Sequence, residues 1–180
     1  MSKRLQQDSG FTLIEVCIAL VIASVLLASA IPSLQRWVLR ERMQATAQSM
    51  LTDLQQARSE AVMRAGAVHV RFSRFAQGTC YVMHIGASGG CRCSDAGEAI
   101  CTASASALRV NWIPSQQRLT VQANVSNLSF QPRQGAVTST GSIDITGTNG
   151  QTIRQIISIT GRVRSCSPDG GFRNLARCAT

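Results

Sequence analysis

The sequence of 180 residues has few of the side chains that enzymes and metal sites use most. Its two histidines and nine carboxylates leave little material for acid–base catalysis or metal coordination. Aromatic residues make up only 4% of the chain, so a platform for stacking single-stranded nucleic acid would have to be small. We therefore expect neither enzyme activity nor a cofactor nor a metal site.

Negative charge and lysine are also scarce. Eighteen basic residues against nine acidic ones give a formal net charge of +9, and Lys3 is the only lysine. From Arg109 to the C-terminus the chain has eight arginines and only two acids, Asp144 and Asp169. Such a concentration of arginine is typical of a surface that binds phosphate groups. The alternative is a solvated strand edge whose charges prevent pairing with another strand.

Before residue 80 the chain has a single cysteine, Cys17, within an apolar run. The other six form an even set: Cys80, Cys91, Cys93, Cys101, Cys166 and Cys178. All six lie beyond the apolar run around Cys17, which has the character of a membrane-export segment. An even set of cysteines in that position predicts disulfides in an oxidising compartment. Cys166 and Cys178 flank a Pro-Asp-Gly-Gly turn and are expected to pair, which leaves three pairings for the other four.

Cys91-Arg-Cys93, with Cys101 and His69 or His84, also permits a zinc site. Zinc ligands normally follow a spacing of two to four intervening residues between cysteines, and a single intervening residue fits this poorly. Disulfides are therefore the better interpretation of these cysteines.

A short basic leader precedes an apolar run that extends to Ile31. About 20 apolar residues suffice to span a bilayer, and Lys3 and Arg4 would keep the leader in the cytoplasm. No small-residue cleavage site of a secretory signal follows the run, which continues into a helical pattern. Pro32 is expected to kink or locally melt this helix.

The segment Gly10-Phe-Thr-Leu-Ile-Glu15, between the leader and the apolar run, resembles the type IV prepilin signature. The resemblance implies that a prepilin peptidase cuts after Gly10 and that Phe11 becomes an N-methylated first residue. It also identifies Glu15 as an acidic residue that acts in assembly. A carboxylate in an apolar helix is costly in lipid unless it is paired, so we expect it to pair with the Phe11 amine. The alternative is a Glu15 that reaches the lipid headgroups.

Beyond Pro32 the apolar positions recur at helical spacing, three or four residues apart. They are Met43, Ala47, Met50, Leu54, Ala57 and Ala61. Polar residues such as Asp53 and Glu60 fall mostly on the other sides of the helix, which should end near Ala65. Gly66 is the candidate C-cap.

From Ala67 onward the apolar period changes to two, which predicts about seven short, antiparallel strands. The clearest are residues 68–72, 108–112, 119–123, 128–130, 143–145 and 157–159. Residues 99–107 are expected to form a loop. The fold class is therefore α+β, with a long N-terminal α-helix packed against an antiparallel β-sheet headgroup, as the resemblance to type IV pilins also implies.

This organisation divides the chain into three segments. Residues 1–10 are the leader, and residues 11–37 are the transmembrane and assembly half of the helix. Residues 38–180 are a periplasmic headgroup, made of helix residues 38–65 and a β-rich domain at 67–180.

Two further motifs, Phe130-Gln-Pro-Arg-Gln-Gly135 and Gly161-Arg-Val-Arg164, resemble the C-terminal half of FimT/GspH-type minor pilins and pseudopilins. In the FimT branch, which is associated with natural transformation, the Gly-Arg-x-Arg motif is implicated in DNA binding. The resemblance places that role on Gly161, Arg162 and Arg164.

The residues support the same interpretation by themselves. Arg162 and Arg164 would point the same way on a strand, and guanidinium groups bind phosphate bidentately. A Cys166–Cys178 disulfide would fold the tail back beside this pair. The full set of candidate DNA contacts is Gly161, Arg162, Arg164, Arg173, Arg177, Arg154 and Arg133.

The sequence thus predicts a minor type IV pilin that binds extracellular DNA, without sequence preference, for uptake and pilus biogenesis. It would be a single-pass inner-membrane protein with a cytoplasmic N-terminus before processing, and then part of a pilus fibre at the periplasm or cell surface. Its partners would be DNA, other minor and major pilins, the prepilin peptidase and the inner membrane. The alternatives are a FimU-like minor pilin that primes the fibre and a GspH-type pseudopilin of type II secretion.

Overall fold

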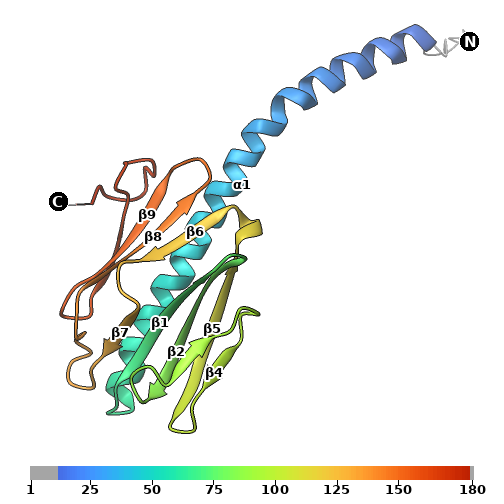
Figure 1. Cartoon of the computed structure of the whole chain (residues 1–180). Coiled ribbons are helices and arrows are strands. Elements are labelled where there is room, and N and C mark those ends of the chain that lie inside the picture. Colours follow the sequence, from blue (N-terminus) through green and yellow to red (C-terminus); the bar gives the residue numbers. More distant parts are fainter. Residues whose placement is uncertain (1–11, 179–180) are drawn as a thin grey trace, which may run out of the picture. The chain divides into compact units, whose positions relative to one another are not determined.

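The computed structural model describes residues 12–178 (Figure 1). The chain divides into two compact units, one ending at Val38 and the other beginning at Leu39. A single helix, α1 (Leu13–Met63), contributes to both units. All the buried side chains among the described residues belong to the second unit, which therefore contains the hydrophobic core of the described structure.

In the first unit, α1 carries exposed apolar side chains along its length, among them the free thiol of Cys17. The helix is long and apolar enough to cross a membrane, by length and composition. Thr12 precedes its first turn, and its carbonyl accepts a 3.1 Å hydrogen bond from the backbone N–H of Glu15. The helix is continuous through Pro32, so the expected local melting does not occur. Gly10 and Phe11, the expected processing site, lie outside the described residues.

In the second unit, the predicted apolar stripe of α1 forms the centre of the core. The six residues from Met43 to Ala61 that define the stripe are each at most 5% exposed, so this prediction is confirmed.

The placement of Asp53 on a polar side of the helix was wrong, because this residue is also buried. Its carboxylate accepts a 2.6 Å hydrogen bond from the Tyr81 hydroxyl and lies 3.1 Å from an Arg109 nitrogen. Burial first, and then the Asp53 carboxylate, raise the pKa of Tyr81 above its ordinary value.

Helix α1 ends in two backbone hydrogen bonds that together form a Schellman motif. The Gly66 N–H donates to the Ala61 carbonyl at 3.2 Å, and the Ala65 N–H donates to the Val62 carbonyl at 3.3 Å. The residue in the left-handed conformation is Ala65, with φ of 49°. The prediction that Gly66 is the cap was therefore wrong by one residue.

The described residues form ten strands after α1, together with the short 3-10 helix η1 (Ser115–Gln117). The strands are β1 (Val68–Phe75), β2 (Gly78–Gly86), β3 (Cys91–Cys93), β4 (Ala99–Cys101), β5 (Ala105–Pro114), β6 (Leu119–Ala123), β7 (Asn127–Phe130), β8 (Gly141–Gly147), β9 (Thr152–Ile157) and β10 (Val163–Cys166). They build two four-stranded sheets, ordered β5-β2-β1-β7 and β10-β9-β8-β6, and the small sheet β3-β4. All pairings between these strands are antiparallel, which confirms the predicted α+β class.

The observed strands correct the sequence prediction in four places. Strands β2 and β3 were missed, and part of the expected loop at residues 99–107 forms β4 and the start of β5. Strand β9 ends at Ile157, so the strand expected at residues 157–159 gives way to a turn. Strands β3 and β4 have three residues each, too few for an alternation of apolar and polar side chains to be recognised. Strand β2 is buried on both faces and so lacks that alternation.

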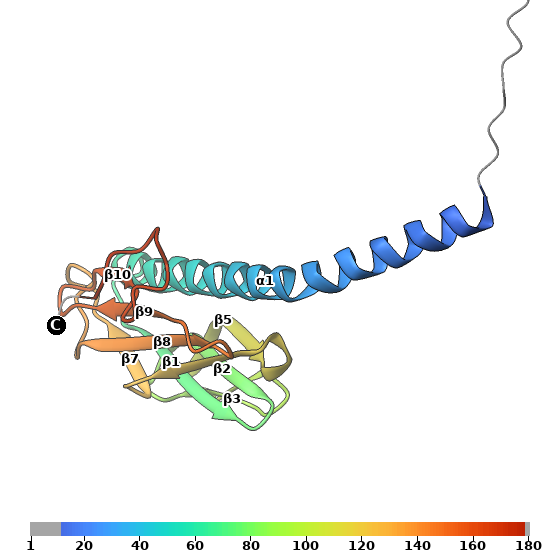
Figure 2. The ribbon, with the colours of Figure 1, turned by 90° about the horizontal axis from the view of Figure 1, so that it is seen from above.

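Side chains of β2 alternate between two packed layers. Tyr81 and Met83 belong to the main core with α1, whereas Cys80 and Val82 belong to a second cluster with the cysteines of β3. Figure 2 shows the consequence, with α1 on one side of the β1–β2 sheet and β3 on the other.

His69 and His84 form a buried cross-strand pair in this sheet, with ring centroids 5.1 Å apart. His84 is fully buried, and neither of its ring nitrogens has a hydrogen-bond partner among the described residues. Burial lowers the pKa of both histidines, and their proximity lowers that of His84 further. Both rings are therefore neutral in the folded protein near pH 7.

Candidate nucleic-acid interface

The Gly-Arg-Val-Arg motif lies at the edge of the second sheet. β10 is an edge strand that pairs with β9 alone, with Arg164 opposite Ile156. Arg162 directly precedes the strand, and both arginines are exposed. Val163 between them is half-buried and packs against the core, so the alternation places both guanidinium groups on the solvent side.

Gly161 forms the turn that leads into this edge. Its φ is +74°, and its N–H donates a 2.8 Å hydrogen bond to the Ser158 carbonyl. A Cβ at this position would collide with the carbonyl oxygen of Gly135. The close approach that glycine permits here is therefore to another turn of the same chain.

The two C-terminal motifs consequently meet in space. Gly135, the last residue of the first motif, has a φ of +63°, and a Cβ there would lie 2.5 Å from Cγ of Arg58. Nη2 of Arg58 donates a 3.3 Å hydrogen bond to the Gln134 carbonyl. The turns at Gly135 and Gly161 thus pack against each other, and both contact the Arg58 side chain of α1.

Arg58 is a residue that sequence reasoning missed. Its position on the helix, well before the strands, predicts that it lies far from the arginine motif and that its replacement leaves DNA affinity nearly unchanged. It instead shares an open groove of about 700 Å³ with Arg162. We call this the helix groove, and its lining residues are Gln55, Arg58, Ser59, Val62, Met63, Gln134, Gly161, Arg162 and Val163. No local pattern could reveal this contact, because the hydrogen-bonded residues are 76 positions apart.

The predicted disulfide Cys166–Cys178 is present, so this prediction is confirmed. It closes the tail into a loop in which Ser167 pairs with Arg177. Arg173 and Arg177 are exposed. Burial raises the pKa of Asp169 in this loop, but hydrogen bonds from Ser167, Gly171 and Thr152 outweigh burial, so its pKa lies below the ordinary value.

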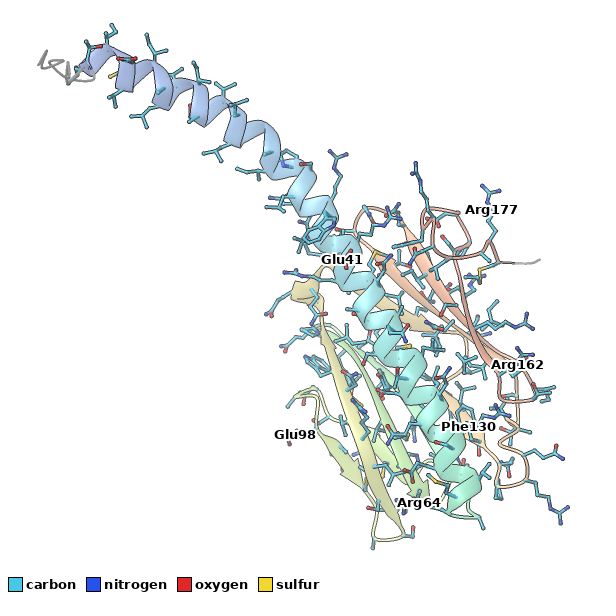
Figure 3. All side chains as sticks on the ribbon, turned by 180° about the vertical axis from the view of Figure 1, so that it is seen from behind. Glu41, Arg64, Glu98, Phe130, Arg162 and Arg177 are labelled. Carbon is cyan, nitrogen blue, oxygen red and sulfur yellow. A yellow bond between two sulfur atoms is a disulfide. The ribbon has the colours of Figure 1, made fainter. Side chains whose placement is uncertain are left out.

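The tail does not lie beside Arg162 as expected. Because Arg177 forms a β-bridge with Ser167, the residue that follows β10, the tail lies beyond the end of this strand opposite Arg162. Arg162 and Ser167 are five positions apart, roughly 17 Å in an extended chain. Figure 3 shows Arg162 and Arg177 well apart along this side of the second unit. We call the four exposed arginines at β10 and in the tail beyond it the arginine edge: Arg162, Arg164, Arg173 and Arg177.

The remaining candidates differ in how much of their charge is free. Arg133 is exposed in the turn between β7 and β8. Arg154 instead makes a bidentate ion pair with Asp144, at 2.6 and 2.8 Å, which raises its pKa. Within residues 12–178, no residue of the arginine edge takes part in an ion pair. The arginine edge therefore presents uncompensated positive charge.

The other four predicted cysteines pair as Cys80–Cys93 and Cys91–Cys101. The first bond fastens β3 to β2, and the second joins β3 to β4 within the small sheet. Together they use the four thiols that a zinc site would need. In the part of the chain that the structure describes, no group of three or more histidine, cysteine or carboxylate residues could hold a metal ion.

Comparisons with known proteins agree with this architecture. The family model described as Type II transport protein GspH matches residues 46–161, and the model described as Prokaryotic N-terminal methylation motif matches residues 5–31. No curated protein sequence matches the chain.

Solved structures with a similar fold include the type IV minor pilin FimU of Pseudomonas aeruginosa in two crystal forms. The match to the first has 22% sequence identity and a TM-score of 0.53, and it covers 70% of the present chain and 97% of the FimU chain. The match to the second has 20% identity and a TM-score of 0.52, and it covers 72% of the present chain and 95% of the FimU chain. The minor pseudopilin EpsH of the Vibrio cholerae Type 2 Secretion System also matches, at 13% identity and a TM-score of 0.44, over 70% of this chain and 97% of that chain.

Proposed function

The chain belongs to the GspH family of minor pilins and pseudopilins, and we propose that it acts as a minor type IV pilin that captures DNA for uptake. The observation that carries the proposal is the arginine edge. Arg162 and Arg164 are exposed on one side of an edge strand, and no carboxylate among the described residues pairs with them. Guanidinium groups so placed can each bind a phosphate through two parallel hydrogen bonds.

Contacts of this kind are made to the DNA backbone. Phosphate contacts carry no direct sequence information, so binding is expected to be independent of sequence. Arg173 and Arg177 add exposed positive charge in the tail that follows β10, and Arg133 adds charge in the turn after β7. Arg154 contributes less, because Asp144 compensates its charge.

The test is equilibrium binding of the full chain, in detergent, to a fluorescent DNA duplex. Arg162→Ala and Arg164→Ala should each weaken binding to all sequences alike, and the double variant should abolish most of it at about 0.15 M salt. The matched control is Arg92→Ala, an exposed arginine in β3 of the separate small sheet, which should bind like the parent. Arg58→Ala is unsuitable as a control because Arg58 adjoins Arg162.

A second candidate function rests on the family match itself, which describes a type II transport protein. If the double arginine variant binds DNA as well as the parent, the arginine edge is only a solvated strand edge. The function would then be a structural one, either a pseudopilin of type II secretion or a minor pilin that primes a fibre.

We also propose that a prepilin peptidase removes residues 1–10 and that the chain then assembles with other pilins. The match of residues 5–31 to the N-terminal methylation motif supports this, as does the apolar helix that follows. Intact-mass measurement of membrane material should give a chain that begins at N-methylated Phe11. A mature N-terminus beyond residue 30 would contradict the proposal.

A further inference from the structure

The helix groove brings together apolar, positively charged and hydrogen-bonding side chains, whereas the arginine edge is defined by its arginines alone. Val62 and Met63, in the last turn of α1, are 48% and 72% exposed, and both line the groove. Arg58 and Arg162 supply positive charge to it, and Gln55, Ser59 and Gln134 supply hydrogen-bonding groups. Large apolar side chains left this exposed beside two cations indicate a binding surface.

A ligand that matches this combination needs an anionic end, a flat apolar body and polar edges. A nucleotide has all three, in its phosphate, the face of its base and the edges of that base. A groove of about 700 Å³ is within the size range of small-molecule sites. In duplex DNA the base is paired and stacked, so only an unpaired base could enter the groove.

The position of Arg162 connects the groove to the arginine edge. This residue directly precedes β10, where the edge begins, and it also lines the groove. A DNA strand that lies along Arg164 and Arg162 would therefore continue toward Arg58 without leaving positively charged surface. This continuity favours DNA over an acidic peptide as the occupant.

We propose that the helix groove binds one unpaired nucleotide of the captured DNA, with Arg58 and Arg162 on a phosphate and Val62 and Met63 against the base. The inference rests on the proposed function, because it extends the same interface. It makes single-stranded DNA, or a strand end, a better ligand than an intact duplex of equal length.

The experiment compares binding of a homothymidine oligonucleotide and of a duplex of equal length to the full chain in detergent. Replacing both apolar residues, Val62→Ser with Met63→Ser, should weaken binding to the single strand about fivefold and leave duplex binding unchanged. Both side chains are exposed, so the variant should keep its fold, and a thermal unfolding curve checks this. Ile100→Ser in β4, where the side chain is as exposed as Val62, is the matched control.

Arg58→Ala is the second variant, and it should weaken single-strand binding more than duplex binding. Because Arg58 also bonds the Gln134 carbonyl, Arg58→Lys is measured beside it, with the unfolding temperature of both. Lysine keeps the charge and should recover part of the single-strand affinity.

The outcomes separate this inference from the proposed function. Equal losses for the two DNA forms in the Val62/Met63 variant, or no loss in either, would overturn the inference while duplex binding through Arg162 and Arg164 stands. Polyglutamate that binds as tightly as homothymidine would also overturn it, because charge alone would then explain the groove. If the chain binds neither single-stranded nor duplex DNA, the proposed function itself is overturned.

Discussion

The buried histidines make the fold sensitive to mild acid. His69 and His84 are neutral in the folded protein, where burial lowers their pKa values, whereas in the unfolded chain they titrate near the ordinary value. As the pH falls below about 6.5, the unfolded chain binds protons that the folded protein does not, so the free energy of unfolding decreases.

We expect the unfolding temperature to be nearly constant above this pH and to fall as the pH drops below about 6.5. Replacing both residues, His69→Gln with His84→Gln, should remove most of that fall, because glutamine does not titrate. Thermal unfolding at a series of pH values measures both curves. Parallel curves for parent and variant would show that other groups cause the acid sensitivity.

Gly161 offers a second test at the scale of the residue. Gly161→Ala should lower the free energy of unfolding by about 2 kcal/mol or more, since the left-handed φ adds to a collision with the Gly135 backbone. Gly150→Ala is the matched control, because Gly150 has a φ of +80° but no atom near its Cβ position, and it should cost about 1 kcal/mol. Chemical denaturation measures both, and equal losses would mean that the contact of the two glycine turns contributes nothing.

At the scale of the element, the end of α1 holds an alanine in the conformation that glycine prefers. Ala65→Gly should therefore stabilise the protein by about 0.5–1 kcal/mol, despite the greater freedom of glycine in the unfolded chain. Gly66→Ala should be tolerated, because the added Cβ would meet only the Arg64 carbonyl at 3.7 Å. Unfolding temperatures of the two variants decide whether residue 65 or 66 acts as the cap.

The same elements show what the sequence could and could not reveal. The stripe of α1 was predictable because residues on one face of a helix recur with a period of 3.6, and every residue of the stripe is buried. Strand β2 was not predictable, because it is buried on both faces and its sequence therefore does not alternate between apolar and polar residues. The buried Asp53 was misplaced for a related reason, since its partners Tyr81 and Arg109 come from distant strands.

The candidate site divides in the same manner. The exposed pair Arg162 and Arg164 and the Cys166–Cys178 bond follow from local spacing, and the structure has both as the sequence suggested. The approach of Arg58 to Gly161 and the place of the tail depend on how the strands are ordered in the sheet. No short motif contains that information, so these contacts became visible only in the folded chain.

At the scale of the molecule, the division at Leu39 predicts that the second unit folds without the first. Its core is complete, because every buried side chain that the structure describes lies at or beyond Leu39. A fragment that begins at Leu39 should unfold cooperatively, and with its three disulfides intact it should remain monomeric in solution. Calorimetry and sedimentation test this, and a fragment without a cooperative transition would show that the apolar part of α1 is needed for folding.

The central claim concerns phosphate binding by the arginine edge, and its salt dependence is the most direct measurement. If about four phosphates are neutralised, the logarithm of the duplex affinity should fall against the logarithm of salt concentration with a slope near −3 to −4. Arg162→Ala and Arg164→Ala should each make that slope shallower by about one, while Arg92→Ala leaves it unchanged. Slopes that are the same for the parent and for both arginine variants would contradict the claim.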